Sequence, residues 1–130
     1  MTQKPIELIL TRHLASSLAM PIFIVDAEGT LVFYNEPAEQ VLGMRFEETG
    51  EMPASEWTTQ WIPTDAAGAP IPPEGLPLSV AVTERRPAHG TFTIHASDGQ
   101  RRQIEVTAIP LVQPGNTVVG AVAFFWEAHA

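Results

Sequence analysis

Two short apolar runs, residues 22–25 and 31–34, lie close together near the start of the chain. Both runs are short and rich in β-branched and aromatic residues, which favours strands over helices. The connection from Asp26 to Gly29 has the composition of a tight hairpin turn, with a glycine that is free to adopt positive φ. Asn35 follows directly and suits the N-cap of a helix. The pattern therefore predicts a β-hairpin that leads into a capped helix.

The preceding segment, residues 5–19, has a helical period instead. Its large apolar residues recur at spacings that predict an amphipathic helix, and they are Ile6, Ile9, Leu10, Leu14 and Leu18. A stripe this apolar needs cover, so the helix either lies across its own domain or pairs with the same helix of a second copy. We expect a parallel homodimer through this helix and the outer face of the sheet. Residues 1–20 then form a flanking dimerisation segment, and residues 21–128 form the main domain.

The middle of the chain, residues 44–75, contains many proline and acidic residues and shows no sustained period. Short helical turns and loops are expected there. Trp57 and Trp61 stand four positions apart, so they share one face of a helical turn. After a pair of prolines, apolar positions recur at helical spacing and predict a helix over residues 74–86.

Three alternating segments occupy the last third of the chain, at residues 91–96, 103–109 and 117–126. Turn sequences with Asp-Gly and Pro-Gly pairs separate them, which predicts a meander of antiparallel strands. Since a strand alternates sides, one face points inward with Phe92, Ile94, Ile104 and Val106, and the other points outward with Thr93, His95, Glu105 and Thr107. We expect the first hairpin to pair beside the last strand. Together these elements predict an α+β domain: a five-stranded antiparallel sheet with helices on one face and an N-terminal amphipathic helix.

Composition limits the classes of function. The chain has 130 residues, of which 45% are hydrophobic, enough for one domain with a real core. Its formal net charge of -8 would repel a phosphate backbone, so nucleic acid is not an expected partner. The absence of cysteine excludes disulfides and thiolate chemistry, and it fits a cytoplasmic location. The apolar stretch at residues 14–25 is too short to span a membrane, so no membrane is expected as a partner.

The order of these elements resembles the PAS domain family. The resemblance rests on FIVDAEGTLVFYNEPAEQVLG, the first hairpin with its capped helix, and on HASDGQRRQIEVTAIPLVQPGNTVVGAVAFFWE, the closing meander, and it covers about residues 14–127. It implies a sensory or interaction module rather than an enzyme. Such a module has a pocket between the inner sheet face and the helices, and it signals to a partner protein or an effector domain. Turn and cap chemistry explains the motif residues, which are Asp26, Gly29, Asn35, Asp98 and Gly99.

The resemblance also guides the choice of ligand. Flavin-binding members need a cysteine and polar side chains on the closing strands, but no cysteine is present and the aligned positions are Ile94, Ile104 and Val122. Haem-binding members mostly take a histidine from the helix that matches residues 74–86, and this helix has none. Neither flavin nor haem is therefore expected. The interior either binds a small apolar ligand such as a fatty acid or is filled by side chains. The pocket candidates are Trp57, Trp61, Leu78, Val82, Phe92, Ile94, Ile104, Val106, Val122 and Phe124.

Two other kinds of site have weaker support. No metal is expected because the histidines lack the spacing of a ligand set, at His13, His89, His95 and His129. The alternative function is a small cone-shaped α+β enzyme that uses a buried carboxylate as acid or base, with Asp26 or Glu105 as candidates. The first of these lies in a predicted turn and the second on the polar face of its strand. A non-catalytic sensor module, or a dimerisation module without cofactor, is therefore preferred.

Overall fold

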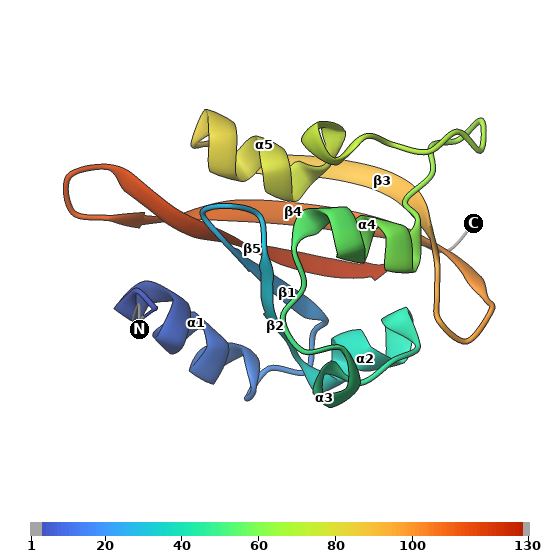
Figure 1. Cartoon of the computed structure of the whole chain (residues 1–130), viewed down its shortest axis with the longest axis horizontal. Helices are drawn as coiled ribbons and strands as arrows, with labels where there is room; N and C mark the ends of the chain where they lie inside the picture. The colour runs from blue at the N-terminus through green and yellow to red at the C-terminus, as the bar shows by residue number, and fades with distance from the viewer. Residues whose placement is uncertain (1–3, 129–130) are drawn as a thin grey trace.

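The computed structural model describes residues 4–128 of the chain. A five-stranded antiparallel sheet, in the order β2-β1-β5-β4-β3, forms the centre of the fold (Figure 1). The first hairpin pairs beside the last strand, so the predicted α+β class with five antiparallel strands is confirmed. The strands are β1 (Ile22–Asp26), β2 (Leu31–Tyr34), β3 (Ala88–His95), β4 (Arg101–Gln113) and β5 (Thr117–Glu127).

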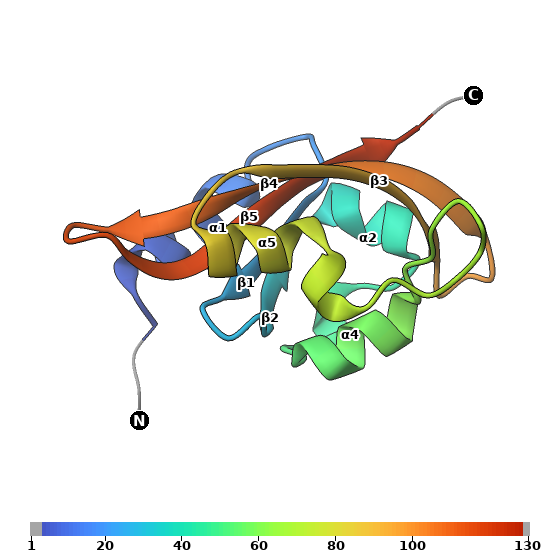
Figure 2. The same ribbon diagram turned by 90° about the horizontal axis from the view of Figure 1, so that it is seen from above.

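Helices cover the two faces of the sheet unequally (Figures 1 and 2). Side chains of α2, α4 and α5 pack against what we call the inner face and form the larger core with it. Side chains of α1 pack against the opposite, outer face and form a second, smaller core. The helices are α1 (Ile6–Ala15), α2 (Glu36–Leu42), α3 (Phe46–Thr49), α4 (Ala54–Trp61), the short 3-10 helix η1 (Pro73–Gly75) and α5 (Pro77–Glu84).

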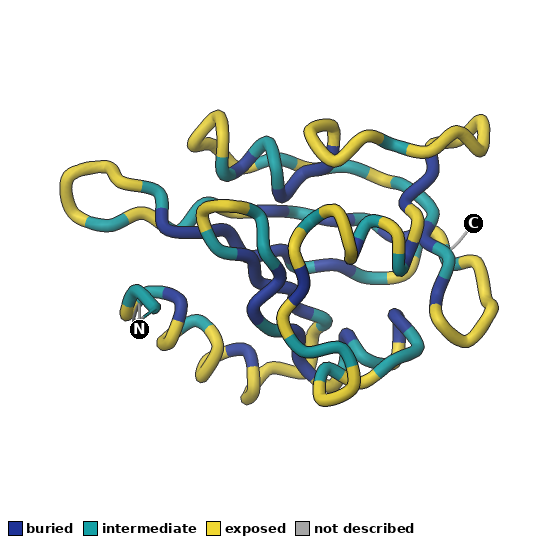
Figure 3. Tube along the Cα trace, viewed as in Figure 1, coloured by how far each residue is buried: buried dark blue, intermediate teal, exposed yellow. Residues whose placement is uncertain are grey.

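Strand β1, the second strand of the sheet, is buried along almost its whole length and lies within the dark blue region of Figure 3. Phe23 and Val25 point into the inner core, whereas Ile22 and Ile24 point into the outer one. This alternation follows from the period of two along a strand. A strand that is apolar on both sides therefore separates the two cores and contributes side chains to each.

Asn35 holds three segments of the chain together. Its side-chain Oδ1 accepts hydrogen bonds from the N–H of Ala38 at 3.2 Å and of Ile22 at 3.0 Å. The first bond is the predicted N-cap of α2, which is confirmed. Its Nδ2 donates to the carbonyl oxygens of Ala15 at 3.0 Å and Met20 at 2.9 Å. The same buried side chain thus starts α2 and fixes the end of α1.

The position of α1 on the outer face depends on one glycine. Leu8 is 2% exposed and lies over Gly120 of β5, where a Cβ would come within 2.8 Å of the leucine Cδ2. Only a residue without a side chain leaves this depression in the sheet. Arg12 adds a second contact, with its guanidinium 4.6 Å from the ring centroid of Phe33. The helix is therefore docked on its own domain.

Two predicted helices are shorter than expected. The helix predicted over residues 5–19 ends at Ala15, since a turn follows before the strand. The helix predicted over residues 74–86 begins at Pro77, because Leu76 precedes a proline and adopts an extended conformation with ψ 148°. The expected short helical turns of the middle region are α3 and α4.

Candidate functional site

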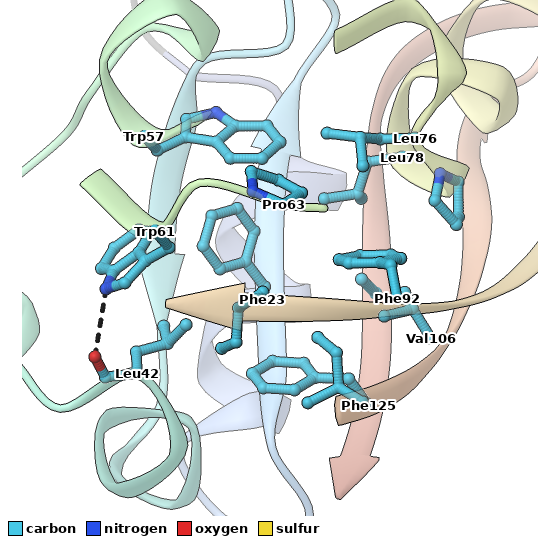
Figure 4. Close-up of a pocket in the computed structure, with 14 residues that line it drawn as sticks. Phe23, Leu42, Trp57, Trp61, Pro63, Leu76, Leu78, Phe92, Val106 and Phe125 are labelled. Carbon is cyan, nitrogen blue, oxygen red and sulfur yellow. Dashed lines mark hydrogen bonds between the residues drawn. The ribbon is translucent and has the colours of Figure 1, made fainter. Parts of the chain in front are cut away.

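One apolar cavity lies between the inner face of the sheet and the segments that carry α4 and α5 (Figure 4). Its volume is about 60 Å³. For comparison, an engineered cavity of about 150 Å³ stays dry and binds benzene. In Figure 4, Phe23 lies near the centre, with the indoles of Trp57 and Trp61 to one side and Phe92 and Val106 to the other. The cavity is small, and aromatic rings dominate its walls.

Both tryptophans of α4 are fixed by their indole N–H groups. Trp57 Nε1 donates to the carbonyl oxygen of Gly29 at 3.0 Å, in the turn between β1 and β2. Trp61 Nε1 donates to the carbonyl oxygen of Leu42 at 3.1 Å and to Ser97 Oγ at 3.2 Å, in the turn between β3 and β4. Buried indoles usually find such partners. Two walls of the cavity are thus tied to two hairpin turns of the sheet.

Sequence reasoning placed many of the cavity residues. The lining residues among the candidates are Trp57, Trp61, Leu78, Phe92, Ile94, Ile104 and Val106. The ones it missed are Phe23, Leu42, Pro63, Leu76, Pro77, Ala123 and Phe125. Several of these stand next to prolines or in loops, where no periodic pattern shows which side is buried. The alternation of β1 contained a signal for Phe23, since a strand buried on both faces must present alternate residues to each core.

Three candidates do not line the cavity. Val122 packs in the outer core and Phe124 against it, on the side of the sheet that α1 covers. The sequence assigned them to the wrong face because every position of β5 from 118 to 126 except Gly120 is apolar, so periodicity could not distinguish its two sides. Val82 packs at the edge of the inner core but contributes nothing to the cavity wall.

The cavity walls contain no acid or base. None of the lining residues is charged, and the two carboxylates proposed for an enzyme lie elsewhere. Asp26 Oδ1 accepts from the N–H of Glu28 at 2.9 Å and of Thr30 at 3.1 Å, so it organises a turn. Glu105 lies on the outer face, where it accepts from Trp126 Nε1 at 3.0 Å. The enzyme hypothesis therefore has no site in this cavity.

An ion-pair cluster ties the β3–β4 turn to other elements. Arg102 bonds Asp98 at 2.8 Å, lies 3.3 Å from Glu127, and donates to the carbonyl oxygen of Val41 in α2 at 3.0 Å. The hydrogen bond from Arg102 lowers the pKa of Asp98 below its usual value. The turn predicted at Asp98 and Gly99 is therefore also a junction with α2 and with the end of β5.

The predicted dimer stripe of α1 points away from the domain. Ile6, Leu10 and Leu14 are 62%, 59% and 59% exposed, and Ile9 and Leu18 are both 37% exposed. Apolar side chains in such a row rarely stay uncovered in a stable monomer. Two apolar residues of β4 are exposed as well: Ile109 on the outer face and Val112 near the end of the strand.

The described residues contain neither a candidate metal site nor a candidate membrane span. Between residues 4 and 128, no group of three or more histidine, aspartate or glutamate side chains could hold a metal ion. No helix in this part of the chain combines the length and the apolar character that crossing a membrane requires.

Fold and site together define an α+β domain in which helices close an apolar cavity over an antiparallel sheet. The sequence profile described as the PAS fold matches residues 15–129, and the chain belongs to this family. The predicted family resemblance is thereby confirmed.

Solved PAS domains have similar structures. One from Bordetella pertussis BvgS is 15% identical, with a TM-score of 0.59 over 95% of this chain and 87% of that one. One from Colwellia psychrerythraea is 17% identical, with a TM-score of 0.66 over 92% and 97% of the two chains. The PAS domain of nitrogen regulation protein NR(II) from Vibrio parahaemolyticus is 16% identical, with a TM-score of 0.59 over 92% and 98%. At these identities the similarity shows the fold alone. A search of curated proteins found no match.

Proposed function

We propose that this chain is a non-catalytic sensor module of a signal-transduction system, which responds to a small apolar ligand and signals through a homodimer to a partner protein or effector domain. Its family supports the general class, and a similar domain belongs to a nitrogen regulation protein. The observation that carries the proposal is the apolar cavity between the sheet and α4. Its walls are apolar, and none of the lining residues is charged.

The cavity dimensions favour a compact ligand. A volume of about 60 Å³ is far too small for flavin or haem, and we expect neither cofactor. It is also too small for a long acyl chain, so of the ligands that the sequence leaves open a short apolar molecule fits better than a fatty acid. The competing interpretation is that side chains simply fill this part of the core, as they do in most domains.

The output of the module would be a dimer built on α1. The row of exposed apolar residues on α1 supports this part of the proposal, because a two-fold axis would bury the same stripe of both copies. Leu10 lies near the middle of the helix and Leu14 near its end, and both are expected in the interface. The acidic, cysteine-free chain is suited to the cytoplasm, where we expect it to act.

Native mass spectrometry of freshly purified full chain tests the ligand. The expected result is a small neutral mass that is present under native conditions and lost on denaturation. A flavin or haem mass would contradict the proposal about cofactors. The absence of any bound mass, together with no binding of added apolar molecules, would favour the interpretation of an ordinary core.

Light scattering at micromolar concentration tests the dimer. The full chain should be dimeric, and the double variant Leu10→Glu, Leu14→Glu should be monomeric because its interface would bury charge. Thr59→Glu is the control. It adds a negative charge at an exposed position of α4, a helix on the opposite side of the sheet from α1. If the unaltered chain is already monomeric, α1 packs only on its own domain and the dimer proposal is lost.

A further inference from the structure

We propose that the cavity recognises a small neutral aromatic molecule built on a single ring. The inference rests on the proposed sensor function and names the class of ligand that this function leaves open. Three features of the cavity wall support it: its polarity, the geometry of its rings and the place where it can enlarge.

The cavity has no polar group to spare. Its lining side chains offer two hydrogen-bond donors, the indole N–H groups of Trp57 and Trp61, and both already donate to backbone carbonyl oxygens. Arg102 does not line the cavity, and its guanidinium is paired with Asp98 and Glu127. A carboxylate or a hydroxyl of a ligand would lose its water without gaining a partner, which is costly. The ligand should therefore be neutral and free of strong hydrogen-bonding groups.

The aromatic rings of the wall pack edge to face, and the ring of an aromatic guest would extend this arrangement. Phe23 meets Trp57 edge to face, with ring centroids 5.2 Å apart and planes at 67°. It meets Trp61 in the same manner, at 6.1 Å and 81°. Phe92 of β3 and Phe125 of β5 complete the aromatic lining. Such walls present ring edges and ring faces together, and an aromatic guest gains contact energy from them beyond the area it buries.

The size of the cavity limits the guest to one ring. Its volume of about 60 Å³ is less than half of the roughly 150 Å³ that accepts benzene, so the wall must give way on binding. Phe92 is the place where it can do so, because this ring is only partly buried whereas Phe23, Trp57 and Phe125 are buried. A flat, compact molecule needs the smallest displacement of Phe92. A chain or a fused ring system needs more.

Thermal melting of the full chain with three probes tests the inference. The probes are toluene, methylcyclohexane and hexanoate at equal concentrations. Toluene should raise the melting temperature because it binds the native state alone. Its apparent affinity should exceed that of hexanoate about tenfold or more, since hexanoate would bury an unpaired carboxylate. Methylcyclohexane should bind more weakly than toluene, because it has no ring face to offer.

Two variants locate the site. Ala123→Val adds two carbons at a lining position of β5 and should abolish the toluene effect by filling the cavity. Ala66→Val makes the same change at an exposed turn position outside the cavity and should respond like the unaltered chain. A toluene response that survives in Ala123→Val would overturn the site, and equal responses to toluene and hexanoate would overturn the ligand class.

The proposed sensor function fails on a different result. If toluene has no effect but native mass spectrometry finds another small molecule bound, the aromatic inference is wrong and the sensor remains. If neither probe nor native molecule binds, both proposals fail.

Discussion

Replacing Asn35 by aspartate separates the two tasks that this side chain performs. Aspartate keeps an Oδ1 that can accept from Ala38 and Ile22, so the cap of α2 survives. It lacks the Nδ2 that donates to Ala15 and Met20, so the end of α1 loses its anchor. The variant should therefore loosen α1 and spare α2.

The magnitude follows from the burial of the site. Each lost hydrogen bond contributes about 1 kcal/mol, and two are lost. The new carboxylate oxygen also faces two carbonyl oxygens at a position where Asn35 is only 2% exposed. Together these effects should lower the unfolding free energy of Asn35→Asp by about 3–5 kcal/mol at neutral pH. Burial raises the pKa of the new carboxyl above its unfolded value of about 4, so the native state binds the extra proton. The loss of stability should therefore shrink as the pH falls towards about 4.

Hydrogen exchange read by mass spectrometry separates the two helices. In Asn35→Asp, amides of residues 6–20 should exchange faster while those of residues 36–42 stay protected. In Asn35→Ala both segments should exchange faster, because the cap is lost as well. Asn116→Asp is the matched control, since it makes the same chemical change at an exposed turn and should cost below about 0.5 kcal/mol. Unchanged exchange in residues 6–20 of Asn35→Asp would refute the anchoring role.

Three further variants and one titration test other parts of the structure. Ile104→Asp should lower the unfolding free energy by about 3–5 kcal/mol because it buries an unpaired charge. Glu105→Gln on the outer face should lower it by less than about 1 kcal/mol. Equal melting temperatures of the two variants would contradict the strand register. Gly120→Ala should lower the unfolding free energy by about 1–3 kcal/mol, since its Cβ meets the carbonyl oxygen of Val25 in β1 as well as the side chain of Leu8. It should also speed exchange in α1, and unchanged exchange there would show that the glycine does not seat the helix. Burial raises the pKa of Tyr34, the single tyrosine, to about 12, so ultraviolet absorbance should report its ionisation near that pH. The unfolding free energy should fall as the pH rises above about 10, because the unfolded tyrosine ionises first. An ionisation of the native protein near pH 10 would contradict the burial of Tyr34.

The order of elements was predictable because each one has a local signal. The turn chemistry at Asp26 and Gly29, the cap at Asn35 and the alternation of β3 and β4 depend on neighbours in the sequence. The docking of α1 has no such signal. Its apolar stripe, predicted from spacing, is exposed, and Leu8 and Ala15 on another side of the helix are buried instead. Which side docks is decided by tertiary features far along the chain, above all the depression at Gly120.

The cavity was predictable only where a strand or helix had one apolar side. Ile94, Ile104 and Val106 lie on strands with an alternating pattern, and they line the cavity. β5 has no such pattern because both of its faces are covered, and the assignment of Val122 to the inner face was wrong for this reason. Pro63 comes from a loop, where local sequence carries no period at all.

The cavity and the exposed stripe of α1 share one support, the strand β1. Phe23 forms part of the cavity wall, while its neighbours Ile22 and Ile24 lie in the outer core together with Leu8 of α1. Consecutive side chains of a strand point to opposite faces, so the two regions are separated by the thickness of one backbone. On the outer side, Ile22 and Ile24 are fully buried with Leu8, and such tight packing leaves little room to absorb a displacement locally. We therefore expect that a ligand which also shifts Phe23 would disturb Ile22 and Ile24, which seat α1, and would in this way connect ligand binding with the proposed dimer interface.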